Sequence, residues 1–547
     1  MSMAAALTVG CSSDDITADN GGGVNTDGKS YVGLSITLPS VNGNRSANDQ
    51  FDMGSADEYK VNDLVIRYLD ENGTELKSFK YTADQLIWST PPAGEGITTT
   101  AVLPVEKVPF SGKAYALVEI NNPFEGSSIA ANSVCDLKSD DKKSADYLTG
   151  EDKDDFFMTN TVWRDGHYLV PVTASATENE AQALAGTHTV YVERAAAKVQ
   201  LDVNAKDKDN WYKATYTVPE GLSNAGAKIQ VSDWVLDVTN TKMYPIRKFR
   251  GNIPYEQGGL PDDETYKFYR FYSWKNGGYR TYWAEDPNYS QYVENDFNVI
   301  SEYPENPNAL GGVEYCLENT FDVKNQCQNQ TTRALIKATY KPVGDEFKLG
   351  TTWYTIGNSS TPLSAKALTA LVAKAIAKKG VVLQEEKMTA GTKPFVGEMF
   401  TISEENLSDE DIAKVKKDLG DLTVYKNGVC YYVVRIKHFG DEICPWGDEP
   451  NAPAVSGIKY DEYAKNYDGN RAAYDLAYLG RYGVVRNNWY HLELQSVSGP
   501  GTPWIPDPSD PDNPTPPGTD DDEADAYISV KITINPWTYW TQGVDLH

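Results

Sequence analysis

Short segments in which hydrophobic and polar residues alternate recur along much of this chain. The first, "YVGLSITLP", begins at residue 31, and "VNDLVIRYLD", "AYALVEI", "HYLVPVTAS" and "HTVYVERAAAKVQLDV" follow. Turn-forming residues separate these segments. A period of two is typical of strands with one buried face. Many short strands with turns between them predict an all-β sandwich.

A second set of alternating segments predicts a second β-domain. It comprises "AKIQVSDWVLDVT", "RALIKATYKPV", "VCYYVVRIKHF" and "VVRNNWYHLELQSV". A length of 547 residues is sufficient for two or three domains. We place the boundary in the polar stretch 205–225, which gives β-sandwich domains over residues 46–215 and 216–498.

Two segments have the period of amphipathic helices. "SAKALTALVAKAIAKKG" has Ser364 as an N-cap and Gly380 past its end. "SDEDIAKVKKDLG" begins at Ser408, has acidic residues in its first turn and ends at Gly420. We interpret both as short packing elements on a β-domain.

The last strand of the sequence is isolated. In "AYISVKITINP" hydrophobic residues alternate with Ser529, Lys531 and Thr533. A segment rich in Pro, Gly and Asp, residues 499–526, separates this strand from the predicted domain. We assign residues 527–547 to a C-terminal strand whose hydrophobic positions are Ile528, Val530, Ile532, Ile534 and Trp537.

The first and last strands share one pattern. Residues 31–38 and 527–534 both begin with Tyr and carry a β-branched residue or Leu at every even position, among them Leu34, Ile36 and Leu38. The two strands therefore suit the same groove. If the first strand were removed, the open edges would be a template for a strand of another chain. A head-to-tail contact of this kind does not close and generates a fibre.

The charge of the chain narrows the classes of partner. The formal net charge is −28, so a nucleic acid or an anionic membrane surface would be repelled. The acidity fits a solvated extracellular surface. No run of about 20 apolar residues is present, so we expect no membrane-spanning helix.

The N-terminus resembles the end of a bacterial lipoprotein signal. "MSMAAALTVGC" is a small apolar run that ends at Cys11, the residue that would be lipidated. We assign residues 1–11 to a signal remnant and residues 12–45 to a tether with the first strand. The alternative is an N-terminus outside the fold in which the Cys occurs by chance.

The remaining cysteines form no CxxC motif. Their spacing suits two local disulfides, and buried free thiols are the alternative. The two pairs would be Cys316 with Cys327 and Cys430 with Cys444, leaving Cys135 unpaired.

One sequence motif matches a nucleotide-binding pattern. "GVNTDGKS", residues 23–30, fits the P-loop consensus. A working P-loop follows a buried strand and begins a helix, whereas here a polar tether precedes the motif and a strand follows it. We reject nucleotide binding and predict no catalytic residues, metal site or cofactor. Aromatic residues in 268–292 could stack on sugar rings or pack in loops.

Several segments, taken in order, resemble a known family. "FFMTNTVW", "VERAAAKV" and "WVLDV…MYPIRKFRG" precede "VVRNNWYHLELQSV", a Pro/Asp-rich linker and "YISVKITINPW…VDL". This order is similar to that of the type V pilins, the major fimbrial subunits of Bacteroidetes, and in particular to the shaft subunit of the short (minor) fimbriae.

The resemblance implies a fold and a maturation route. The fold is two tandem transthyretin-like Greek-key β-sandwiches with a C-terminal donor strand. The precursor is a palmitoylated lipoprotein of the outer membrane, and an Arg-specific protease cuts it between Arg45 and Ser46. Cleavage removes strand 31–38, and the C-terminal strand of the next subunit replaces it. The product is a homopolymer at the cell surface.

The resemblance also implies partners and a role. Tip and anchor subunits complete the fimbria, which supports adhesion, biofilm formation and virulence; the sequence names no receptor. Two alternatives remain open: a tip or accessory adhesin of the same system, and a glycan-binding surface lipoprotein that keeps its N-terminus.

Overall fold

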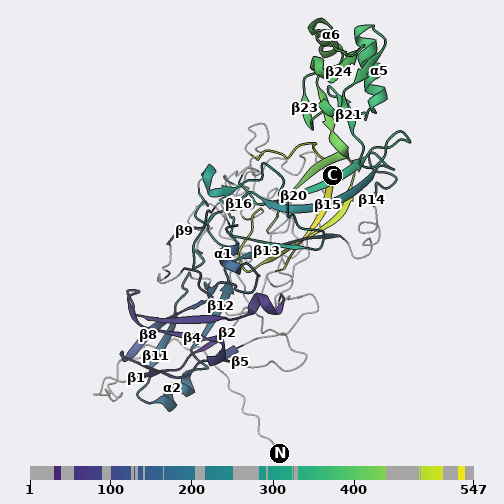
Figure 1. The fold of residues 1–547 in the computed structure, drawn as a ribbon. Coiled ribbons are helices and arrows are strands. Elements are labelled where there is room, and N and C mark those ends of the chain that lie inside the picture. Colours follow the sequence, from purple (N-terminus) through teal and green to yellow (C-terminus); the bar gives the residue numbers. More distant parts are fainter. Residues whose placement is uncertain are drawn as a thin grey trace, which may run out of the picture.

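The protein is mainly β, as the alternating pattern predicts (Figure 1). In Figure 1 the first domain lies at the lower end, the second in the middle, and a small module with α5 and α6 at the upper end. The computed structural model describes residues 30–37, 54–88, 100–124, 129, 133–139, 142–163, 166–203, 216–249, 283–290, 293–322, 325, 330–438, 480, 482–508 and 528–535.

The first domain is built on one large sheet with the strand order β4-β3-β8-β10-β12-β2-β6-β5, to which β11 adds beside β8. A separate pair, β1-β7, and the helices α1 and α2 complete it. The bounds are β1 (Ser30–Val32), β2 (Ser35–Thr37), β3 (Asp63–Leu69), β4 (Glu75–Thr82), β5 (Ile87–Trp88), β6 (Thr100–Val102), β7 (Glu106–Val108), β8 (Gly112–Ile120), α1 (Asp146–Thr149), β10 (Met158–Asn160), β11 (Val170–Ala174), α2 (Glu178–Leu184) and β12 (Thr189–Arg194).

The second domain is a sandwich of two four-stranded sheets. Their orders are β19-β13-β28-β29 and β14-β15-β20-β27, and one hydrophobic core includes residues of both sheets. The predicted class, mainly β with β-sandwich domains and a few short helices, is confirmed. The bounds are β13 (Ala197–Val203), β14 (Tyr216–Thr217), β15 (Lys228–Asp237), β19 (Val313–Cys316), β20 (Arg333–Lys341), β27 (Val429–Arg435), β28 (Trp489–Val497) and β29 (Ile528–Asn535).

The chain passes from the first domain to the second between Ala196 and Ala197. Ala195 and Ala196 pack in the first core, whereas the next residue, Ala197, packs in the second. β13 runs parallel to β28, in the second sandwich. The predicted boundary near 215 therefore differs from the structure, because "HTVYVERAAAKVQLDV" was interpreted as one segment of the first domain. Its hydrophobic positions change from even (Val190, Val192) to odd (Val199, Leu201) across the three alanines, which is where the domain changes.

Two further strand pairs lie near the junction. β9 (Cys135–Asp136) of the first domain pairs with β17 (Lys242–Met243) of the second. β16 (Thr239–Asn240) pairs with β18 (Phe297–Asn298). The two sandwiches are thus connected by sheet hydrogen bonds as well as by the chain.

A separate module is inserted between β20 and β27. It contains two three-stranded sheets, β21-β26-β23 and β22-β24-β25, with α5 and α6 packed on a core of their own. The sequence pattern predicted the two helices as decoration and did not predict an independent core. The bounds are β21 (Trp353–Ile356), α5 (Ala365–Ile376), β22 (Val381–Leu383), β23 (Gly391–Lys393), β24 (Phe400–Ile402), β25 (Glu405–Asn406), α6 (Asp409–Leu419) and β26 (Leu422–Tyr425).

The predicted caps of these helices are present. The Ser364 hydroxyl accepts a hydrogen bond from the Ala367 N–H at 3.3 Å, and Ser408 does the same for Asp411. Such a bond satisfies one of the N–H groups that lack a partner in the first turn. Gly420 follows the last residue of α6, and its φ of +74° suits glycine. α5 ends at Ile376, so Gly380 lies past its end, as predicted.

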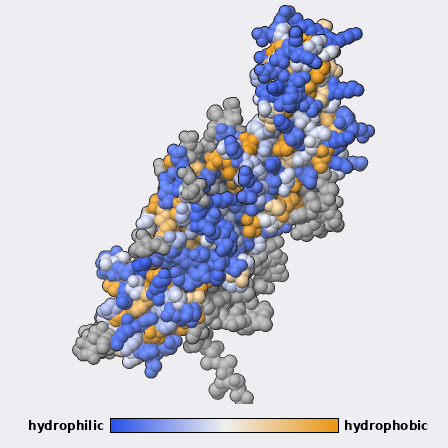
Figure 2. Space-filling model, viewed as in Figure 1, coloured by the Kyte–Doolittle hydropathy of each residue, from blue (hydrophilic) through white to orange (hydrophobic). Residues whose placement is uncertain are grey.

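The visible surface is mainly hydrophilic, with hydrophobic residues in separate patches (Figure 2). Scattered exposed hydrophobic residues are normal for a folded domain. None of the helices in the described ranges is both long enough and apolar enough to cross a membrane.

A buried ion pair joins the two domains. Glu58, before β3, lies 2.7 Å from the ammonium of Lys198 in β13, and the Tyr315 hydroxyl in β19 also donates to it. Burial opposes ionisation of Glu58, but the Lys198 charge and the hydrogen bonds from Lys198 and Tyr315 outweigh it and lower its pKa. The carboxylate is therefore ionised at neutral pH.

A second set of buried charges lies nearby. The Arg247 guanidinium donates two hydrogen bonds to Glu193 of β12, at 2.8 and 2.7 Å. Arg486 pairs with Glu318 at 2.6 Å and donates to the carbonyl oxygens of residues 244 and 245. A charge-assisted pair with two parallel hydrogen bonds, such as Arg247 with Glu193, fixes relative orientation strongly. This pair therefore orients the first domain relative to the second.

We expect Glu58→Gln to lower the free energy of unfolding by about 3–5 kcal/mol, because it leaves a buried ammonium without its carboxylate. Urea denaturation at a series of pH values measures this. A lowered pKa stabilises above the unfolded value, so the difference from wild type should be full near neutral pH. It should shrink as pH falls through the pKa of Glu58.

Asp154→Asn is the control for this experiment. Asp154 forms an exposed ion pair with Lys60, and exposed pairs contribute little. If Glu58→Gln changed stability as little as Asp154→Asn, the buried pair would not hold the two domains together.

Candidate functional site: the groove of the N-terminal strand

The N-terminal strand lies inside the first sheet. β2 runs parallel to β12 and antiparallel to β6, with Ile36 opposite Val190 and Ala101. Upstream, β1 pairs with β7. The strand is therefore central and not an edge strand, and its removal would leave β12 and β6 without their common neighbour.

The side chains of this strand form part of the core. Val32 and Leu34 are 1% exposed and Ile36 is 0% exposed. Leu34 and Ile36 were predicted on the buried face, and Leu38 lies outside the described residues. Val32 is also at an even position, so the pattern alone could have predicted that it is buried. Burying an aliphatic side chain of this size stabilises by about 1.5–3 kcal/mol.

One continuous segment follows the outer side of the strand. We call residues 175–188, which include α2, the clasp segment. At its start Ser175 exchanges two backbone hydrogen bonds with Tyr31, at 2.9 and 2.8 Å. At its end the His188 carbonyl accepts from the Ser35 N–H at 3.0 Å. Nothing in the period-two pattern identified this segment.

The His188 ring also contacts the strand. Its Nε2 accepts from the Thr173 N–H at 3.2 Å, so Nδ1 carries the proton and donates to the Gly33 carbonyl at 3.0 Å. The structure thus places His188 in the wall of the groove.

The C-terminal strand lies in the second domain. β29 forms the edge of its sheet and runs antiparallel to β28, with a register shift between Leu494 and Ser496. The buried Tyr490 and Leu492 of β28 stand opposite Ile534 and Ile532. Within this chain the predicted donor strand thus pairs with its own second domain and not with the first.

The segment before β29 is partly attached. Thr502 exchanges backbone hydrogen bonds with Tyr431 at 2.8 and 3.0 Å, and the Pro506 carbonyl accepts from Arg333 at 2.6 Å. The predicted linker 499–526 therefore begins on the surface of β27. The part between the last described residue and β29 is 509–527.

Several predicted site residues lie outside the described residues: Cys11, Arg45, Ser46 and Trp537. Of the P-loop match, only Ser30 is described, and it begins β1, not a helix.

The structure addresses three of the cysteines. Cys135, Cys316 and Cys430 are free, and the last two are buried. Burial raises the pKa of Cys430 to about 11, so its thiol stays protonated and inert. This is the free-thiol alternative for these residues; Cys327 and Cys444 lie outside the described residues.

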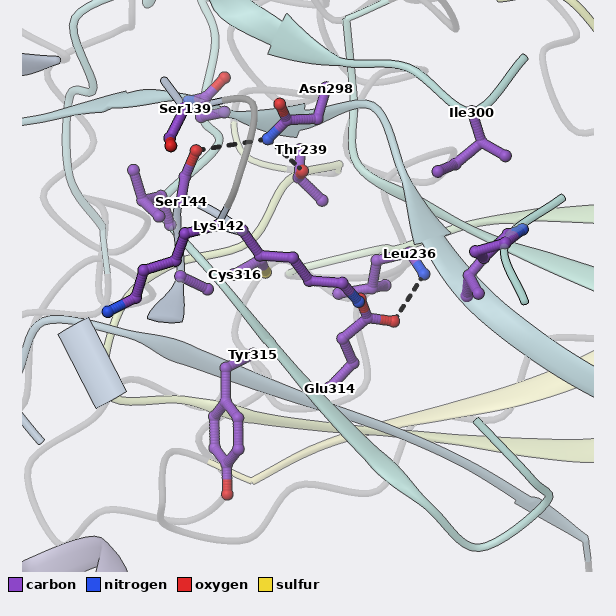
Figure 3. Close-up of a pocket in the computed structure, with 16 residues that line it drawn as sticks. Ser139, Lys142, Ser144, Leu236, Thr239, Asn298, Ile300, Glu314, Tyr315 and Cys316 are labelled. Atoms are coloured by element: carbon purple, nitrogen blue, oxygen red, sulfur yellow. Dashed lines mark hydrogen bonds and ion pairs between the residues drawn. The ribbon is translucent and has the colours of Figure 1, made fainter. Parts of the chain in front are cut away.

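A cavity of about 350 Å³ lies at the junction of the two domains (Figure 3). Its polar groups contact one another: Lys143 pairs with Glu314 at 2.6 Å, and Asn298 donates to Ser144 and Thr239. Lys142 lies over the Tyr147 ring. With its charges already engaged, this cavity is a weaker candidate than the groove.

The C-terminal region matches a known family. Residues 455–543 match the model of the C-terminal region of the type IV major fimbrial subunit protein, fimbrillin. Over this region the chain is similar to the fimbrillin family. The match includes both β29, the predicted donor strand, and β28, the strand with which it pairs.

Solved structures of similar proteins come from related bacteria. A fimbrilin from Porphyromonas gingivalis is 13% identical, with 93% of this chain and 99% of that chain covered and a TM-score of 0.35. A candidate cell adhesion protein from Parabacteroides distasonis is 12% identical (93% and 100% covered; TM-score 0.39). A fimbrial assembly protein from the same species is 10% identical (58% and 85%; 0.25). The similarity to fimbrillin rests on the match of residues 455–543.

We expect Ile36→Ala to lower the free energy of unfolding of the intact chain by about 2–5 kcal/mol, since it removes buried volume from a packed core. Thermal or urea unfolding measures the change. Val102→Ala, on the neighbouring strand but 42% exposed, should have a much smaller effect. Equal effects of the two variants would show that the strand does not contribute to the core.

Proposed function

We propose that this protein is the shaft subunit of a cell-surface fimbria and polymerises by strand exchange. The observation that carries the proposal is the central position of the N-terminal strand between β12 and β6, with Val32, Leu34 and Ile36 buried in the core. A strand in this position can be replaced but not simply lost. The fimbrillin match over the C-terminal strand supports the same role.

Maturation would begin at the outer membrane. The precursor is exported as a lipoprotein through Cys11, and an Arg-specific protease cuts between Arg45 and Ser46. This removes β1 and β2 from the chain that contains the groove. It leaves the backbone of β12 and β6 without a partner on one side. It also removes Val32, Leu34 and Ile36 from the core, and their burial contributes about 4.5–9 kcal/mol to stability.

The C-terminal strand of a neighbour would restore what is lost. Its even positions carry Ile or Val where the first strand has Val, Leu or Ile, and its backbone would pair with β12 and β6. To reach the groove it must leave β28. About 19 residues, 509–527, would then span up to about 60 Å if extended as a Pro-rich chain. The hydrogen bonds of Thr502 and Pro506 attach the start of the linker to the second domain, so only the residues after them can extend toward a neighbour.

The donor strand distinguishes the shaft role from that of a tip. A tip subunit ends the fibre and needs no strand to donate, whereas the shaft subunit needs both a groove and a strand. The role is structural and not enzymatic. Adhesion and biofilm formation would follow from the fibre, with tip and anchor subunits at its ends.

The decisive test treats purified precursor with an Arg-specific protease. We expect a new N-terminus at Ser46 and a ladder of stable oligomers on an unheated denaturing gel. Ile532→Asp should leave the monomer folded and cleaved but give no ladder, because a carboxylate would be buried in the groove. Arg45→Ala is the control and should stay uncleaved and monomeric.

Two outcomes would contradict parts of this scheme. Clean cleavage without a ladder in the wild type would favour a tip or accessory subunit. A normal ladder from Ile532→Asp would exclude the C-terminal strand as the donor.

A disulfide between β28 and β29 tests whether the donor strand must leave its own domain. Glu493 and Lys531 are directly opposite each other. After cleavage under oxidising conditions, Glu493→Cys/Lys531→Cys should give no ladder, and a reductant should restore it. Each single cysteine variant is a matched control and should polymerise in both conditions. A ladder from the oxidised double variant would show that β29 stays on β28 during assembly.

A further inference from the structure

The strongest unassigned feature is the close approach of α2 to Gly33. Gly33 separates β1 from β2 and is buried. A Cβ at this position would lie 2.2 Å from the carbonyl oxygen of Ala181 and 3.0 Å from the Cβ of Ala185. Real side chains essentially never show such a distance. Only glycine fits between the strand and the helix, and a glycine within a strand pattern often marks a close backbone approach.

The contact between α2 and the strand is small. α2 has seven residues, and only Ala181 within it is buried; Ala185, just past its end, is buried too. In Figure 1 α2 lies beside β1, at the lower end of the first domain. A helix of this length has little stability of its own. It can therefore move away from the groove without disrupting the sheet below it.

The donor strand differs from the first strand at this position. When Tyr31 is aligned with Tyr527, Gly33 corresponds to Ser529. The hydrophobic positions agree between the strands, but the donor carries a Cβ where α2 leaves no room. Serine is small, so the conflict is with its Cβ and not with the size of its side chain.

We propose that the clasp segment, residues 175–188, distinguishes the two strands and opens when the donor strand enters. In its closed conformation the clasp segment fits a strand that has glycine two residues after its Tyr. The chain's own N-terminal strand, with Tyr31 and Gly33, is such a strand. Ser529 of the donor displaces α2 outward from Gly33's former place. Residue 529 is thus a specificity-determining residue of the contact between donor strand and groove. The position of α2 shows which of the two strands occupies the groove. This inference rests on the strand exchange proposed above.

Before cleavage the first strand binds the groove more stably than a donor strand would, and cleavage removes this difference. In the precursor the closed clasp segment adds the Ser175, His188 and Ala181 contacts to those of the sheet. After cleavage the N-terminal strand is no longer tethered, and the donor can replace it at the cost of opening the clasp segment. Own strand and donor are therefore bound by the same groove in two different conformations.

The test uses synthetic donor peptides of residues 525–538. The acceptor is the full-length processed subunit with the oxidised Glu493→Cys/Lys531→Cys disulfide, so that its own donor strand cannot compete. Three peptides are compared: wild type, Ser529→Gly and Ser529→Ala. Affinity is measured by fluorescence anisotropy, and amide hydrogen exchange is measured across residues 178–188.

We expect the Ser529→Gly peptide to bind about fivefold or more tightly than the Ser529→Ala peptide. Ser529→Ala should resemble wild type, because both carry a Cβ. Intrinsic strand propensity works the other way, since glycine weakens a strand relative to alanine. Exchange in α2 should be faster with the wild-type peptide bound than with the Ser529→Gly peptide.

The remaining outcomes separate the two proposals. If all three peptides bind but Ser529→Gly is equal to or weaker than Ser529→Ala, the clasp inference is wrong and strand exchange stands. If none of the peptides binds, strand exchange into this groove fails, and the inference fails with it.

Discussion

Every buried strand of this protein needs a hydrogen-bonded neighbour on each side, and the other features of the structure depend on this requirement. β12 is paired on one side with β10 and on the other with β2, and β6 depends on β2 in the same way. Backbone groups buried without partners cost too much to be tolerated. The groove must therefore always be filled, by the chain's own strand in this structure and by a neighbour's strand in the proposed exchange. Polymerisation as proposed follows from this requirement, with no need for a specialised binding site.

The same requirement applies at the other end of the chain. β29 occupies an edge of the second sandwich, so its departure uncovers only one neighbour, β28. A central strand leaves two neighbours and part of a core. The difference favours transfer of the C-terminal strand toward a vacated groove. The buried charges between the domains, Glu58 with Lys198 and Arg247 with Glu193, would hold the two sandwiches in place during the proposed transfer.

Local patterns in the sequence predicted much of this fold. The alternation at Leu34 and Ile36 predicted the buried face of the first strand, and the caps Ser364 and Ser408 predicted where two helices begin. The domain junction at Ala196 was missed because the change of hydrophobic parity across three alanines is a weaker signal than the polar stretch that follows β13. The α5–α6 core and the pairing of β29 with β28 were missed because they depend on contacts between distant residues. Gly33 was visible in the sequence, but the helix that makes it necessary was not.

The parallel pairing of β12 with the strand in the groove has a mechanical consequence. A donor in the register of β2 would be pulled from its N-terminal end, where its linker begins. β12 would be pulled from its C-terminal end, where Ala195 and Ala196 lead into β13. Two parallel strands pulled from opposite ends are loaded in shear, so all of their hydrogen bonds resist together. A strand inserted in the reverse direction would be peeled away one bond at a time, and such a fibre would break under much lower tension.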